Sequence, residues 1–173
     1  VVRCFDSSDI QNVNPTVDPI RDLEIIETEM MLSDLESVEK RLDKKNKKNL
    51  SSQNLKILET ALDCLNNEKS LSILSEENDM KTLNQTGLIS IKPKIFVCNV
   101  DEGSVSNGNK YTEIFTEKFG KKNTLIISAD IENQINQLGS DEKENYMKMI
   151  GLNKTGLNQL IQKGYEILNL DTF

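Results

Sequence analysis

Polar side chains follow two apolar runs in the second half of the sequence, and these side chains could hold a ligand. The first run, Ile95 to Cys98, has four apolar residues without alternation, as in a strand buried on both faces, and "NVDE" (99–102) follows it. The second run, "NTLIISA" (123–129), ends in "SAD" (128–130). If the two runs are neighbouring parallel strands, the loops that follow them lie side by side at one edge of the sheet. In open α/β sheets this edge, at the carboxyl ends of the strands, is where ligands bind.

The chemistry of this edge depends on an amide and its neighbouring carboxylates. The Asn99 amide offers both a donor and an acceptor, and a carboxylate accepts hydrogen bonds from amino or imino groups. Such groups, with a serine-alanine turn beside them, can grip the edge of a flat heterocycle. The plainer interpretation is that Asn99 and Asp101 only turn the chain after a strand. The residues by themselves leave both interpretations open.

The elements around these loops follow the alternating order of an α/β protein. "VVRCF" (1–5) is apolar and is expected to join the same sheet as the two later runs. The order of strand, helix and strand is typical of a parallel sheet with right-handed crossovers. The predicted elements after Gly87 are a strand at 92–100, a helix at 109–120 ended by Gly120, a strand at 123–129, and helices at about 130–138, 141–149 and 156–168.

A helical segment interrupts the sheet residues in the first half of the chain. Apolar residues at steps of three and four predict a long helix from Ile20 to about Lys45, with Asp18 as N-cap and Pro19 in the first turn. A second helix is predicted at about 51–67, and the two form an antiparallel, coiled-coil-like hairpin. A shorter helix is expected after Ser75. The predicted domains are therefore 1–18 and 89–173 for the sheet, and 19–88 for the inserted helices.

The composition excludes several classes of protein. A net charge of −7 argues against broad, nonspecific binding of nucleic acids, although it leaves room for a local basic patch. No apolar run approaches the roughly 20 residues that a membrane span needs. The chain has no histidine, which excludes Ser-His-Asp and Cys-His catalysis within it and argues against zinc. We expect the three unpaired cysteines to be reduced and buried.

Long runs of the sequence resemble one known family. The runs that carry the resemblance are "VVRCFDSSDI", "VDPIRDLEIIETEMMLSDLESVEKRL", "KPKIFVCNVDE", "ISADIE" and "GLNQLIQKGYEILNLDTF". In the order and spacing of these runs, the chain resembles the YchF/Obg-like ATPase family over nearly all of its length, and it matches loosely only at the hairpin tip and around 66–80. The resemblance implies part of a P-loop NTPase (G-domain) sheet with an inserted helical hairpin. It also implies a cytoplasmic, ribosome-associated ATPase that prefers ATP and accepts GTP.

The resemblance also assigns roles to individual residues. "NVDE" occupies the fourth nucleotide-binding motif, which in this family ends in Glu, here Glu102, and is associated with ATP preference. Asn99 would contact the purine, and Val100 would lie against the nucleotide with its backbone available. The fifth motif would comprise Ser128, Ala129 and Asp130.

The phosphate-binding parts of such an enzyme are not found in residues 1–173. There is no GxxxxGK[ST] loop to cradle phosphates, and no hydroxyl in such a loop to bind Mg²⁺. From the resemblance we expect these parts, and a catalytic histidine, to precede Val1, and a TGS domain to follow Phe173. The expectation is therefore an internal fragment that recognises the base and does not hydrolyse ATP by itself.

Positive charge gathers where the helical hairpin is predicted to turn. "KRLDKKNKKN" (40–49) holds six of the basic residues, and we call four of its lysines the basic tip: Lys44, Lys45, Lys47 and Lys48. The resemblance favours a phosphate-directed contact with the ribosome or another RNA. The alternative is a solvated turn, and no aromatic residue is present there to stack on bases. A competing function for the whole chain is a non-catalytic module that binds protein or RNA through the hairpin.

Overall fold

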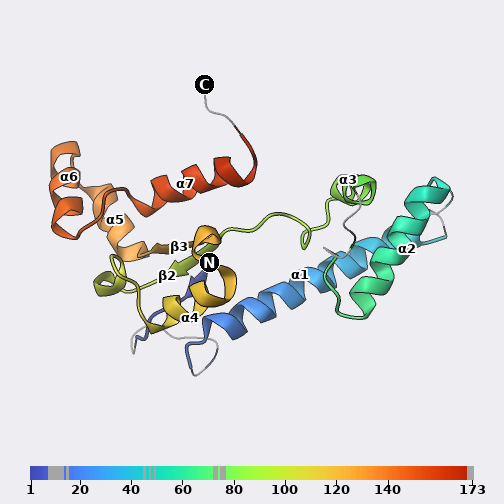
Figure 1. Cartoon of the computed structure of the whole chain (residues 1–173), viewed down its shortest axis with the longest axis horizontal. Coiled ribbons are helices and arrows are strands. Elements are labelled where there is room, and N and C mark those ends of the chain that lie inside the picture. The colour runs from blue at the N-terminus through green and yellow to red at the C-terminus, as the bar shows by residue number, and fades with distance from the viewer. Residues whose placement is uncertain are drawn as a thin grey trace. The chain divides into compact units, whose positions relative to one another are not determined.

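The chain forms two compact units in the computed structural model, and each is described by itself. The sheet unit comprises Val1–Leu23 with Pro93–Phe173, and the helical unit comprises Glu24–Lys92. Most helices and strands of both units are labelled along the chain in Figure 1. The structure describes residues 1–7, 14, 16–44, 46, 48, 50–71, 74 and 77–170.

The sheet unit is built on three parallel strands in the order β1, β2, β3, which confirms the predicted α/β class. The strands are β1 (Val2–Arg3), β2 (Phe96–Asn99) and β3 (Thr124–Ile127). Phe96 pairs with Thr124, the first residue of β3, and Asn99 pairs with Ile127, the last. The middle strand was predicted from residue 92 and begins at Phe96, because Pro93 has no N–H to donate and no residue of β3 pairs with the chain before Phe96.

Four helices of the sheet unit match the predicted positions to within about a turn. They are α4 (Lys110–Phe119), α5 (Ala129–Gln137), α6 (Ser140–Met149) and α7 (Gly156–Ile167), with short 3₁₀ turns η3 (Glu102–Ser104) and η4 (Lys121–Asn123). Asn109 caps α4 by accepting from the backbone of Tyr111 and Thr112. Gly120 ends α4 with a φ of 83°, as predicted, because a residue without Cβ adopts this conformation without strain.

The core of the sheet unit joins the strands to α4. Cys4, Cys98 and Phe115 are fully buried in it, together with Val100. The Phe115 ring packs edge-on against Phe96, with ring centroids 5.6 Å apart. This packing holds β2 in place, so the residues at its carboxyl end start from a rigid base.

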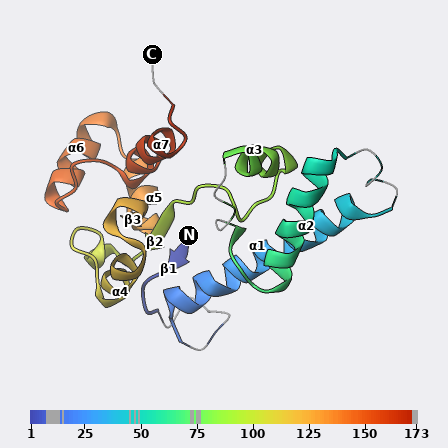
Figure 2. The ribbon, with the colours of Figure 1, turned by 45° about the vertical axis from the view of Figure 1, so that its right-hand side comes forward.

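The helical unit contains most of α1 (Pro19–Leu42), with α2 (Ser52–Asn66) and α3 (Glu77–Thr86) (Figure 2). Asp18 caps α1 as predicted, since its Oδ1 accepts from the backbone N–H groups of Ile20 and Arg21 at 3.1 Å. Val38 of α1 belongs to a buried cluster with Leu58 of α2. The coiled-coil pairing of α1 with α2 stays a prediction, and Ser75 lies outside the described residues.

A buried carboxylate ties the end of the helical unit back to α1. Asp34 is only 1% exposed, and its two oxygens accept from the backbone N–H groups of Ile89 and Ser90, each at 2.7 Å. A buried acid is stable when its charge is met by donors in this way. Among the described residues, no helix is both long and apolar enough to cross a membrane.

Candidate functional site

The two polar loops meet at the carboxyl edge of the sheet. The side-chain Oδ1 of Asn99 accepts from the backbone N–H of Ala129 at 3.0 Å. One residue later, the backbone N–H of Val100 donates to the carbonyl of Ile127 at 2.9 Å. The loops "NVDE" and "SAD" therefore form one continuous edge, as the parallel topology predicts.

The contact with Ala129 fixes which way the Asn99 amide faces. A backbone N–H can pair only with the amide oxygen, so the NH₂ group of Asn99 must point away from Ala129. An amide oxygen has two lone pairs, and one of them remains after this bond. Asn99, which is half-buried, thus keeps two N–H donors and one acceptor position for a ligand.

The other residues of "NVDE" have separate partners. Val100 is buried in the core, with 2% of its surface exposed. Contrary to the expectation, its backbone N–H is not available to a nucleotide, because it is bonded to Ile127. Asp101 accepts from the hydroxyl of Ser104 at 2.8 Å, which closes the short turn η3. The exposed Glu102 accepts through Oε1 from the side-chain amide of Gln134. The amide and the two acids thus act on different neighbours.

The residues of "SAD" form the start of α5. Ser128 is 1% exposed, and its hydroxyl lies 3.5 Å from the backbone N–H of Ile131, in the N-cap position. Asp130 is exposed in the first helical turn, where a negative charge is favoured by the helix dipole. The helix thus begins directly at the edge, with Ala129 bonded to Asn99.

A pocket of about 340 Å³ opens beside Asn99 on the same side of the sheet. This volume lies within the range of small-molecule sites. Its walls are mostly apolar, and Asn99, Glu132 and Asn136 add polar groups. A mostly apolar surface of this kind can accept the face of a flat ring. The lining includes Val97, Asn99, Ile127, Ala129, Leu157 and Leu160.

Two cysteines stand directly behind the site. Cys98 precedes Asn99 in β2, and the thiols of Cys4 and Cys98 are buried and hydrogen-bonded to each other. The hydrogen bond to Cys98, and then burial, raise the pKa of the Cys4 thiol far above its usual value. All three cysteines are free and buried, as predicted.

Some residues that shape the edge carry no recognisable signal in the sequence. Glu132 accepts from the backbone N–H groups of Gly156 at 2.6 Å and Leu157 at 3.2 Å, which joins α5 to the start of α7. Gln134 binds Glu102, as described above. The polar spacing along α5 marks its solvent side, but which loop lies opposite it is decided only by the tertiary fold.

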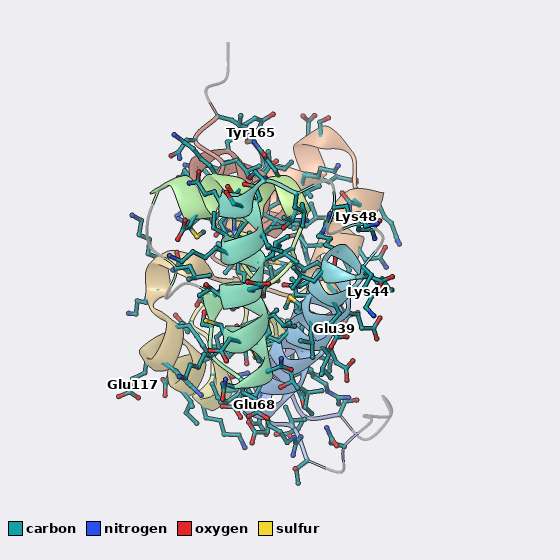
Figure 3. All side chains as sticks on the ribbon, turned by 90° about the vertical axis from the view of Figure 1, so that its right-hand side faces the viewer. Glu39, Lys44, Lys48, Glu68, Glu117 and Tyr165 are labelled. Carbon is teal, nitrogen blue, oxygen red and sulfur yellow. The ribbon has the colours of Figure 1, made fainter. Side chains whose placement is uncertain are left out.

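The basic tip is partly visible in the helical unit. Lys44 and Lys48 lie in the segment after α1, and both side chains are exposed (Figure 3). Lys45 and Lys47 lie outside the described residues. The positions of Lys44 and Lys48 are compatible with either interpretation of this segment, a phosphate contact or a solvated turn.

The geometry described so far is that of an α/β protein with two polar loops that meet at the carboxyl ends of parallel strands. No family model matches the chain. The chain is 34% identical over 185 residues to the ribosome-binding ATPase YchF of Bacillus subtilis, and 32% identical over 181 residues to that of Haemophilus ducreyi. Both alignments cover 100% of this chain and 50% of the relative.

A solved structure agrees with these sequence matches. The structure of the Schizosaccharomyces pombe YchF GTPase superposes with a TM-score of 0.76 and 26% sequence identity, and it covers 97% of this chain and 49% of that chain. The chain therefore belongs to the YchF family, as its sequence indicated. It spans about half the length of the curated relatives that it matches.

Proposed function

We propose that this chain supplies the base-recognition half of a ribosome-associated nucleotide hydrolase that prefers ATP to GTP. The names of the relatives, ribosome-binding ATPase and GTPase, support a nucleotide and a ribosome as its partners. They also support a cytoplasmic location. The proposed organisation, with helices inserted at 19–88, is supported by the division of the structure into two units, which falls after Leu23 and after Lys92.

The observation that carries the proposal is the hydrogen bond between Asn99 and Ala129. Because the bond fixes the amide, its NH₂ group can donate to N7 of either purine. The remaining lone pair of its oxygen can accept from the 6-amino group of adenine, whereas guanine has a carbonyl oxygen at that position. An asparagine that contacts N6 and N7 together is a known way to select adenine. Asn99 thus favours ATP in this geometry.

The remaining residues of the two loops would shape the site around the base. The apolar pocket beside Asn99 supports a flat ring at this edge. The proposed nucleotide-binding residues are Asn99, Val100, Ser128, Ala129 and Asp130, and Glu102 is proposed to belong to the site through the loop that it holds. Phosphoryl transfer also needs a phosphate cradle and Mg²⁺, and we assign both to residues outside 1–173. The chain by itself would then bind a base but would not hydrolyse ATP.

The basic tip would contribute to binding of the ribosome. Its lysines are proposed to contact RNA phosphates from the turn of an antiparallel helical hairpin, and the exposure of Lys44 and Lys48 supports this role. Such contacts give affinity without sequence preference. They add a second binding surface to the nucleotide site of the sheet unit.

The nucleotide proposal is tested by the substitution Asn99→Asp in the complete protein that contains this chain. Asp is almost the same size, and one oxygen can still accept from Ala129, so the local fold is retained. The other oxygen replaces the NH₂ group and faces N7, which is also an acceptor. We expect the dissociation constants of ATP and GTP to rise about tenfold to a hundredfold, which corresponds to about 1.4–3 kcal/mol.

The matched control is Asn123→Asp, which makes the same change at an exposed position before β3, at the other end of the strand. We expect this variant to bind both nucleotides as the parent does. Unchanged binding by Asn99→Asp would place the purine elsewhere. A parent protein that binds GTP more tightly than ATP would contradict the proposed preference while leaving the site in place.

A further inference from the structure

A chain of side-chain hydrogen bonds runs from α6 through α5 to the loop after β2. The hydroxyl of Tyr146 donates to Oε1 of Gln134, and the amide nitrogen of Gln134 donates to Oε1 of Glu102. Three separate elements are linked in this way, because Tyr146 lies in α6, Gln134 in α5 and Glu102 in η3. The link is made by side chains alone.

The direction of each bond in this chain is fixed by chemistry. A carboxylate at Glu102 can only accept, so the NH₂ group of Gln134 must face it. The oxygen of Gln134 then faces Tyr146, whose hydroxyl donates to it. Tyr146 is half-buried and packs against the core of the sheet unit, so the chain of bonds ends on a rigid support.

The loop that these bonds reach is anchored at both ends. Its start is fixed by Val100, which is buried and bonded to Ile127, and its far end is fixed by Val105, which is buried in the same core. Between these two residues lies the short turn η3, which the hydrogen bond between Asp101 and Ser104 closes. Glu102 is the residue of this turn that is tied to α5 through a side chain.

We infer that Gln134 and Tyr146 are positioning residues for the base-binding loop and that they act by holding Glu102. In this arrangement the Glu102 carboxylate anchors the loop to α5 and does not serve as a ligand of the base. Its length matters for that role, because an Asp would be one methylene shorter and would fall short of Gln134. The inference rests on the proposed function, since it names what positions the same site.

The sharpest test exchanges the two ends of the Glu102–Gln134 bond. Gln134→Glu alone sets two carboxylates against each other, and we expect the dissociation constant of ATP to rise about tenfold. Adding Glu102→Gln restores a donor and an acceptor with the direction reversed, while the new carboxylate on α5 can still accept from Tyr146. We expect the double variant to bind ATP within about threefold of the parent, with the parent's ATP/GTP ratio.

The control is Gln137→Glu, which places the same new charge on α5 at an exposed residue whose amide bonds Asn133 of the same helix. It should bind ATP as the parent does. Tyr146→Phe removes only the hydroxyl, and we expect it to raise the dissociation constant of ATP about threefold. This variant provides the test if Gln134→Glu does not fold. Normal ATP binding by Gln134→Glu would overturn the inference. A double variant that does not recover ATP binding would also overturn it, because that result is expected if the Glu102 carboxylate itself contacts the base.

A second measurement separates this inference from the proposed function. Amide hydrogen exchange at Ser104, whose N–H donates to the carbonyl of Asp101, reports the order of the loop without any nucleotide. We expect faster exchange in Gln134→Glu and the parent's rate in the double variant. If the parent binds no nucleotide but exchange follows this pattern, the proposed function is wrong and the anchor stands. If exchange at Ser104 does not change, the anchor is wrong.

Discussion

Two glycines of α7 should respond in opposite ways to substitution by alanine. We expect the protein to lose stability at Gly156, which packs closely against β3, and to gain stability at the other glycine. Gly156 begins α7, and a Cβ added there would lie 2.7 Å and 2.9 Å from two carbons of the Ile127 side chain. It would also lie 3.0 Å from the Glu132 oxygen that accepts from the Gly156 N–H. At Gly164, in the same helix, an added Cβ would meet no atom within 4 Å.

The magnitudes decide the sign at each position. Carbon atoms in favourable contact are about 3.5–4.0 Å apart, so Gly156→Ala would require a shift of almost 1 Å, and overpacking of this kind costs about 1–3 kcal/mol. Loss of the Glu132 hydrogen bond adds about 1 kcal/mol. Alanine in a helix gains about 1 kcal/mol over glycine, which is too little to compensate. At Gly164 only that gain operates, so Gly164→Ala should stabilise by about 0.5–1 kcal/mol.

The assay is urea denaturation of the two variants and the parent, followed by circular dichroism. We expect the free energy of unfolding to fall by about 1–3 kcal/mol for Gly156→Ala and to rise for Gly164→Ala. The reasoning would be refuted by a Gly156→Ala variant as stable as the parent. It would also be refuted if both substitutions raised the free energy of unfolding, because helix propensity would then outweigh the contact with Ile127.

Three further predictions follow from buried or charged groups. Asp34→Asn turns an NH₂ group toward a buried N–H donor, so the free energy of unfolding in urea should fall by about 2–4 kcal/mol. A fall of less than about 1 kcal/mol would contradict the buried hydrogen bonds of Asp34. Cys4 and Cys98 are both fully buried, so iodoacetamide at about pH 8 should label them far more slowly in the native protein than in urea; equal rates would contradict their burial. Changing the four lysines of the basic tip to Gln should weaken ribosome binding and reduce its dependence on salt concentration. The control, Lys121→Gln with Lys122→Gln, should change neither property. An unchanged salt dependence in the first variant would favour the solvated turn.

The sheet and the meeting of the two polar loops at its edge could be predicted because their signals are local in the sequence. The apolar run before Asn99 and the glycine at 120 mark where a strand ends and where a helix stops, whatever else surrounds them. Asp18 caps α1 for the same reason, since a cap acts on the two or three residues that follow it. Parallel order then brings the ends of β2 and β3 together without further information.

The partners of the long polar side chains could not be predicted in this way. Glu102 and Gln134 are 32 residues apart, and their contact depends on how α5 leaves β3. The bond from Asn99 to Ala129 likewise depends on the register of two strands, which neither run determines by itself. Sequence patterns thus located the edge of the site, while the orientation of its amide came from the fold.

The most direct test of the central claim is to find where adenine touches the protein. The complete protein would be labelled with 2-azido-ATP under light, digested, and mapped by mass spectrometry, with ATP and GTP as competitors. We predict labels within 99–104 or 127–130, protection by ATP at lower concentrations than by GTP, and loss of the label in Asn99→Asp. Labels that fall only outside these two loops, or that persist in Asn99→Asp, would contradict the assignment of the base to this edge of the sheet.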